Sequence, residues 1–347
     1  MAKSPKASAK ITFIEQSAPI TEYGRALYAV CRSILRAHID SLTSEDLTDL
    51  NTPLSEVRMR QLAKVARIER DKGIRGDGFE WAVHEAILGK EPTVTHPIAE
   101  AMHRASKHVK DAEPRSMLFG QERAKYLGFT EAVVDEAGTD AFLLPHGNGR
   151  PFKFGPWVSV AARGHTAEAE LSERIKKIWK SDLFISAEDD IRYFAATVKS
   201  NFAQLEGGKG LRIGIVPESK HSKNRSGVRF SQDHGLWVVT LADPHGFMGL
   251  FNDAFHTVAR AICTLGKQVQ PPYFIKPTPM GQRIQDQIEK YPDAKAVEIE
   301  DALNDAAQQD LVESKHRLVS VNAPDWLHVK AMAPKIISPK PRFVRLD

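Results

Sequence analysis

A series of short apolar segments in the second half of the chain constrains the fold more than any other feature of the sequence. Four of these segments lie at 182–186, 193–199, 211–216 and 236–241, and a fifth segment, 247–265, has apolar residues at helical spacing. Apolar runs of five to seven residues bounded by polar or turn-forming residues are typical of buried strands. Strands flanked by helices predict an α/β protein with a central mixed sheet covered on both faces.

Helical patterns dominate the front of the chain and return after the strands. Residues 21–72 form two helical runs, the second opened by Thr52-Pro53, and further helices are expected at 77–89 and 97–110. A hairpin is expected from 141–144 and 157–161, followed by helices at 167–180, 279–291 and 295–314. These patterns predict an α-helical N-terminal region (1–75), an α/β core with inserted helices and a hairpin (76–268), and a helical C-terminal extension with a basic tail (269–347).

Composition excludes several classes of protein. The 347 residues are 42% hydrophobic and 27% charged, which is an ordinary globular balance. No run of about eighteen apolar residues is present, and the N-terminus lacks the apolar stretch of a secretory signal, so we expect a cytoplasmic protein that does not enter a membrane. Cys31 and Cys263 are the only cysteines and lie in apolar helical patterns, so we expect core thiols rather than disulfides or a thiolate zinc site.

An acid begins one strand candidate, and a lysine ends the strand candidate that follows it. Asp182 begins the segment 182–186 and Lys199 ends the segment 193–199. If the two strands pair through the polar turn at 187–191, both side chains come to the same end of the sheet. A carboxylate there can hold a divalent cation, and an ammonium beside it can orient or deprotonate a water and offset charge on a phosphate.

This arrangement resembles the PD-(D/E)XK nuclease superfamily, which includes many restriction endonucleases. In that family one strand supplies an Asp, the next supplies an acid, any residue and a Lys, and an upstream helix often adds a Glu. Ser181-Asp182 corresponds to the first motif and Thr197-Val198-Lys199 to the second, within roughly residues 76–265. The resemblance implies a restriction-endonuclease-like core, Mg²⁺ or Mn²⁺ as cofactor, and DNA hydrolysis in restriction or anti-phage defence. It also implies a homodimer or association with other subunits of a defence system.

Thr197 departs from the family pattern because it stands where an acid is expected. Another acid must then complete the metal site with Asp182, since magnesium usually takes one or two carboxylates together with waters and substrate phosphate. Glu80 and Glu85 are the candidates for the helical Glu, with Glu80 as the expected second metal ligand, and Asp190 is a more distant candidate. An alternative reading gives Glu80 a structural role, because Asp77 and Glu80 have the spacing of an N-terminal capping box.

A second assignment of the acid-any-lysine motif is Glu218-Ser219-Lys220, which follows the strand candidate 211–216. Pro217 interrupts that strand and the residues that follow are loop-like, so the prediction prefers Lys199. We interpret 218–229 instead as a loop that contacts the DNA backbone.

Basic residues suited to phosphate contacts are clustered, although such clusters are also typical of solvated loops. The expected DNA-binding residues are Lys220, Lys223, Arg225 and Arg229, with Asn201 beside the catalytic lysine, and a second basic cluster comprises Lys335, Lys340, Arg342 and Arg345. The sequence therefore predicts a metal-dependent DNA endonuclease. Two alternatives stay open: a non-catalytic DNA-binding or scaffold subunit that keeps the nuclease-like core, and a nucleotide- or RNA-processing enzyme.

Overall fold

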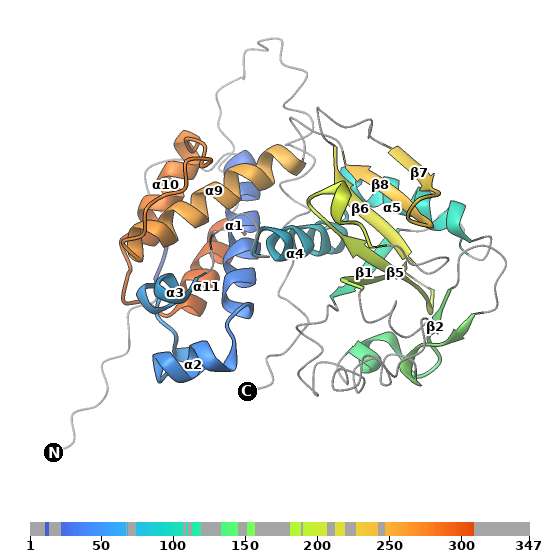
Figure 1. Ribbon diagram of the computed structural model, residues 1–347, viewed down its shortest axis with the longest axis horizontal. Helices are drawn as coiled ribbons and strands as arrows, with labels where there is room; N and C mark the ends of the chain where they lie inside the picture. The colour runs from blue at the N-terminus through green and yellow to red at the C-terminus, as the bar shows by residue number, and fades with distance from the viewer. Residues whose placement is uncertain are drawn as a thin grey trace, which may run out of the picture. The chain divides into compact units, whose positions relative to one another are not determined.

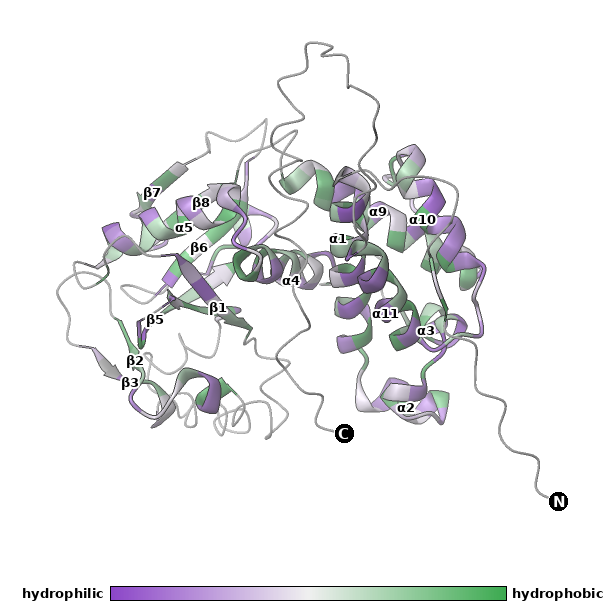
Figure 2. Ribbon diagram, turned by 180° about the vertical axis from the view of Figure 1, so that it is seen from behind, coloured by the Kyte–Doolittle hydropathy of each residue, from purple (hydrophilic) through white to green (hydrophobic). Residues whose placement is uncertain are grey.

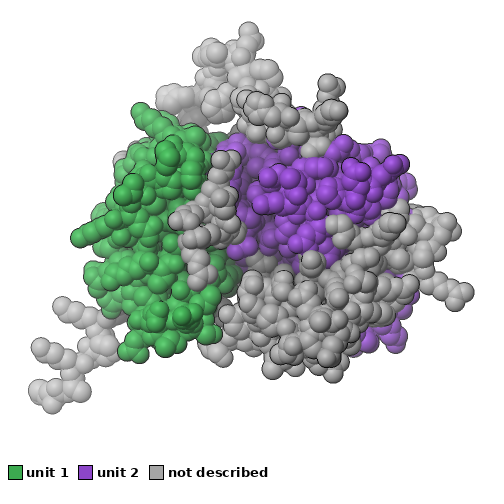
Figure 3. Space-filling view, viewed as in Figure 1, with its two compact units in different colours: residues 1–74, 253–322 green, residues 75–252, 323–347 purple. Residues whose placement is uncertain are grey.

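The computed structural model divides the chain into two compact units (Figure 3). Unit 1 comprises Met1–Ile74 and Asp253–Asn322, and unit 2 comprises Arg75–Asn252 and Ala323–Asp347. The structure describes residues 11–13, 22–66, 68, 74–106, 109, 113–118, 133–144, 151–156, 181–188, 190–206, 212–218, 227–241 and 247–308. The sequence suggested three consecutive regions, whereas unit 1 combines the N-terminal segment with residues 253–322.

Unit 1 is helical, and its two chain segments pack directly on each other. Its elements are α1 (Glu22–Asp40), α2 (Ser44–Leu50), η1 (Leu54–Glu56), α3 (Met59–Val65), most of α9 (Phe247–Leu265), α10 (Pro279–Glu289) and α11 (Ala296–Ala307). Helix α1 lies beside α11 and also contacts α10 (Figure 1). Glu300 of α11 is buried and lies 3.4 Å from the guanidinium of Arg36 on α1. The helices predicted after residue 269 therefore complete the N-terminal helical layer.

Hydrophilic and hydrophobic residues alternate along α1 and α10, as expected of helices with one face in a core (Figure 2). Cys31 on α1 and Cys263 on α9 are buried and free, which confirms the prediction of core thiols. None of the helices in the described part of the chain is long and apolar enough to cross a membrane.

Unit 2 contains a mixed sheet with the strand order β1-β4-β5-β6-β8-β7, which confirms the α/β prediction. The strands are β1 (Pro114–Leu118), β2 (Phe142–Leu143), β3 (Phe152–Lys153), β4 (Leu183–Ala187), β5 (Arg192–Val198), β6 (Arg212–Pro217), β7 (Gly227–Ser231) and β8 (Leu236–Leu241). Strands β5, β6 and β8 are parallel, whereas β4, β1 and β7 run antiparallel to their neighbours. The short strand β2 extends the sheet beside the start of β5 and pairs with β3.

Two helices before the sheet start earlier than the sequence suggested. Helix α4 (Ile74–Leu88) includes Asp77 in its first turn, and α5 spans Pro92–Ala105 rather than beginning at Pro97. The start of α5 follows from local chemistry: the Glu91 carboxylate accepts the Thr93 N–H, and Pro92 occupies the first helical position, where no N–H is needed. Helix α5 packs against β7 and β8, and Phe79 of α4 stacks edge-on against Phe251.

Three of the strands, β1, β3 and β7, differ from expectation. Strands β1 and β7 were not predicted, because both are short edge strands and β7 is polar, with a pattern that resembles a loop. The strand expected at 141–144 contains β2, whose antiparallel partner is β3. Residues 157–161 and the helix expected at 167–180 lie outside the described residues.

His38 on α1 provides a test of the packing in unit 1. Its ring is buried, and neither ring nitrogen has a hydrogen-bond partner among the described residues. Burial lowers the pKa of His38 to about 3. The unfolded chain therefore binds a proton that the folded chain does not, and stability is lost as pH falls below the ordinary histidine value of about 6.5.

We expect this histidine to cost the wild-type protein about 2 kcal/mol of unfolding free energy between pH 7 and pH 5. In His38→Leu that part of the loss should disappear, because leucine does not titrate. Urea unfolding at both pH values measures the difference. Equal pH dependence in the two proteins would contradict a neutral, buried His38.

Candidate active site

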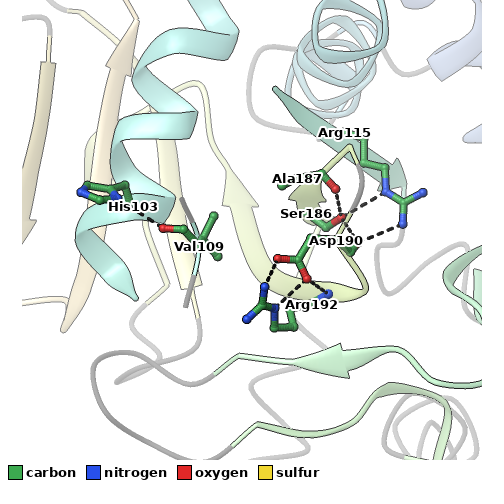
Figure 4. A network of polar contacts seen from close by, with 7 residues as sticks. All are labelled: His103, Val109, Arg115, Ser186, Ala187, Asp190 and Arg192. Carbon is green, nitrogen blue, oxygen red and sulfur yellow. Dashed lines mark hydrogen bonds and ion pairs between the residues drawn. The ribbon is translucent and has the colours of Figure 1, made fainter. Parts of the chain in front are cut away.

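The β4–β5 hairpin positions the candidate site, and a polar network holds its turn (Figure 4). Arg115 of β1 donates from Nε to Ser186 Oγ at 3.1 Å and from Nη2 to the Asp190 carbonyl oxygen at 3.2 Å. Arg192 donates from Nε to Asp190 Oδ1 at 2.6 Å. Asp190 therefore lies at the turn, at the opposite end of β5 from Lys199, so its suggested role as a compensating acid is wrong.

The antiparallel register of β4 and β5 brings Asp182 to the end of β5. Leu183 lies opposite Ala196, and the Asp182 N–H donates to the Ala196 carbonyl oxygen at 2.9 Å. Lys199 follows the last residue of β5, and its N–H donates to the Ile215 carbonyl oxygen of β6 at 2.9 Å. The prediction that the hairpin places Asp182 and Lys199 at the same end of the sheet is confirmed.

Three of the predicted site residues converge at this end. Asp182 Oδ2 accepts the backbone N–H of Val198 at 2.7 Å and lies 3.1 Å from Lys199 Nζ. Lys199 Nζ also lies 3.8 Å from Glu80 Oε1 of helix α4. Both carboxylates are largely buried, whereas the Lys199 side chain is 23% exposed. The ammonium is therefore held between two carboxylates and keeps access to solvent.

The early start of α4 decides between the two readings of Glu80. A capping box would require Asp77 to precede the helix, but Asp77 lies within its first turn, so that reading is wrong. Glu85 is buried five residues farther along α4, where a rotation of about 100° per residue directs it to a different side of the helix from Glu80. Of the two candidates, Glu80 is therefore the one beside Lys199.

The charges around Lys199 determine its protonation state. Burial lowers the pKa of Lys199, but the carboxylates of Asp182 and Glu80 outweigh that effect, and the pKa lies above its ordinary value. Lys199 is therefore an ammonium at neutral pH. In this state it can orient a water and offset negative charge, but it is not a base that removes a proton.

The structure adds Arg212 and Glu206, which the sequence did not identify as site residues. Thr197 is fully buried, and its Oγ1 accepts a hydrogen bond from Arg212 Nη1 at 3.3 Å. The same Nη1 lies 3.9 Å from Glu206 Oε2, and the Glu206 charge also raises the pKa of Lys199. The only signal in the sequence was a cation at the start of an otherwise apolar strand, Arg212 in LRIGIV.

The cluster carries an excess of negative charge. Three carboxylates (Glu80, Asp182, Glu206) oppose two cations (Lys199, Arg212), so the formal sum is 2 − 3 = −1. Among the described residues no group of three or more His, Cys, Asp or Glu side chains is arranged to hold a metal ion. Two carboxylates at one ammonium nevertheless fit Mg²⁺, which usually takes one or two carboxylates and completes its shell with water and phosphate oxygens.

The other predicted residues contact different groups or lie outside the described residues. Asn201 Oδ1 accepts the Ala203 N–H at the start of η5 (Phe202–Gln204), and the Arg229 guanidinium lies 5.0 Å from the centre of the Phe202 ring. The Glu218 N–H donates to the Leu241 carbonyl oxygen, just beyond β6. Outside the described residues lie the remaining basic candidates, Lys220, Lys223, Arg225, Lys335, Lys340, Arg342 and Arg345. Their DNA contacts, and the alternative motif Glu218-Ser219-Lys220, stay predictions.

Replacing Asp182 should show how much the cluster depends on its carboxylate. In Asp182→Ala the Val198 N–H and the Lys199 ammonium both lose a partner, so we expect a loss of about 3 kcal/mol in unfolding free energy. Glu188→Gln is the matched control, because Glu188 forms an exposed ion pair with Lys90 and should change stability by less than about 1 kcal/mol. Denaturant unfolding compares the two, and equal effects would contradict a buried, connected Asp182.

Comparison with known proteins identifies no relative of this chain. No family model matches the sequence, and neither curated proteins nor solved structures match it. The contacts among Asp182, Lys199, Glu80 and Arg212 are therefore the observations from which function is inferred.

Proposed function

We propose that this protein is a metal-dependent DNA endonuclease that hydrolyses phosphodiester bonds. The observation that supports it best is the position of the Lys199 ammonium, 3.1 Å from Asp182 and 3.8 Å from Glu80. An ammonium between two carboxylates at the end of two paired strands matches the chemistry that phosphodiester hydrolysis requires. It also matches the resemblance of these motifs to the PD-(D/E)XK superfamily.

Each side chain has a distinct role in this proposal. Asp182 and Glu80 would hold Mg²⁺ or Mn²⁺, which when bound supplies positive charge to the phosphate and lowers the pKa of a bound water. Lys199, protonated at neutral pH, orients the attacking water and offsets the charge that develops on the phosphate. The Val198 N–H fixes one Asp182 oxygen, so that the carboxylate keeps a single orientation.

Substitution of the two strand residues tests the activity. We expect Lys199→Met and Asp182→Asn to lower the rate of plasmid cleavage in Mg²⁺ by at least ~100-fold, because each removes a charge at the reacting phosphate. Nicking of supercoiled plasmid provides the measurement, with circular dichroism to verify folding. Glu188→Gln, which alters a carboxylate away from this end of the sheet, should cleave at the wild-type rate. A folded Lys199→Met protein with undiminished cleavage would disprove the assignment.

A second candidate function is a DNA-binding or scaffold subunit without metal chemistry. The observation that favours it is Thr197, which provides no carboxylate and is hydrogen-bonded to Arg212. Calorimetric titration with Mg²⁺ and Mn²⁺ separates the two functions. Binding that is lost in Asp182→Asn supports the nuclease, whereas absence of metal binding together with salt-sensitive DNA binding supports the subunit.

A further inference from the structure

Arg212 is a buried cation that the proposed chemistry does not yet use. Its side chain is 0% exposed, and Nη1 donates to Thr197 Oγ1 at 3.3 Å. Neither Nε nor Nη2 has a hydrogen-bond partner among the described residues. A buried donor without a partner costs free energy, and a charged one costs more. A buried guanidinium with two open donors is able to bind an anionic ligand.

The two available donors have the geometry of an oxyanion site. Nε and Nη2 lie on the same edge of a guanidinium and present two nearly parallel N–H groups, which bind phosphate or carboxylate oxygens in a fork. Thr197 takes the separate Nη1 group. Thr197 therefore orients Arg212 and leaves its two-donor edge for a ligand.

The charge around Arg212 does not compensate it fully. Burial lowers the pKa of Arg212 to about 10, and the opposing effects of Glu206 and Asp182 do not restore the ordinary value. Arg212 is still positively charged at neutral pH. An anion at its open edge would therefore meet a cation whose charge Glu206 and Asp182 oppose but do not remove.

Strand register places Arg212 beside the candidate active site. Arg212 pairs with Ala195, and residues 195 and 197 share one face of the sheet because side chains alternate along a strand. Lys199 continues this alternation beyond β5 and contacts Asp182. Arg212 and Lys199 thus supply two cations next to the residue that replaces the family's second acid.

We propose that Arg212 binds a non-bridging oxygen of the substrate phosphodiester through Nε and Nη2. The inference rests on the proposed function for the identity of the anion, and it assigns Arg212 as a second phosphate-binding cation beside Lys199. Because the Arg212 side chain is 0% exposed, phosphate binding requires the groups over the guanidinium to separate. Glu206, 42% exposed and 3.9 Å from Nη1, is the charged neighbour that competes with the incoming anion.

Titration with inorganic phosphate in the presence of EDTA tests the site without cleavage. We expect calorimetry to detect phosphate binding by the wild-type protein and at least ~10-fold weaker binding by Arg212→Met. Arg60→Met is the matched control, since Arg60 forms an exposed ion pair with Asp293 in unit 1 and should leave phosphate affinity unchanged. No binding by the wild-type protein, or equal binding by Arg212→Met, would overturn the inference.

A second variant keeps the test decisive if Arg212→Met does not fold. Glu206→Gln removes the competing carboxylate but retains Arg212, so phosphate should bind at least ~3-fold more tightly than in the wild type. Unchanged or weaker binding in Glu206→Gln contradicts the proposed site.

Plasmid cleavage separates this inference from the proposed function. Phosphate binding that depends on Arg212, without cleavage in Mg²⁺, would retain the anion site and refute the nuclease. Cleavage by a folded Arg212→Met protein at the wild-type rate would retain the nuclease and refute the role of Arg212.

Discussion

The hydrogen bond from the Val198 N–H to the Asp182 carboxylate determines the geometry of the site. It spans 2.7 Å between β4 and β5, at the end of the sheet where regular backbone pairing stops. The Asp182 side chain continues the pairing of the two strands beyond the bond between its own N–H and Ala196. One carboxylate therefore fixes the strand end and holds the Lys199 ammonium, so Asp182 combines a structural role with its proposed chemical role.

The hairpin part of the site could be predicted from the sequence because its determinants are local. Two apolar segments separated by a short polar turn restrict the pairing of β4 and β5, and the register then brings Asp182 next to Lys199. Glu80 was the expected second metal ligand, but the sequence also left open Glu85 and a capping role for Glu80. Choosing it required the start of α4, and the Asp77-Glu80 spacing suggested a helix start three residues too late.

The position of Arg212 beside Thr197, in contrast, depends on a strand pairing that the local sequence does not specify. Strand β6 runs parallel to β5, and parallel neighbours are joined by a connection whose length and path leave the register open. The packing of helices in unit 1 could not be predicted for the same reason. Helices α1 and α11 each have an apolar face, but the sequence pattern does not indicate that these two faces pack on each other. Amphipathic patterns define what an element buries, whereas the partner it is buried against depends on the whole fold.

Thr197 stands where the resemblance to the PD-(D/E)XK motif would place an acid, and its contact with Arg212 gives this difference a physical consequence. A carboxylate at position 197 would sit next to Arg212 as a buried ion pair, and a bidentate pair would occupy two guanidinium donors. Threonine is neutral and accepts a single hydrogen bond, so it orients Arg212 without neutralising it. With Lys199 held between Asp182 and Glu80, the cluster then combines two cations with three carboxylates. In the proposed function this balance would let the cluster hold a divalent cation and a phosphate oxygen together, since each ligand would offset the charge that opposes the other.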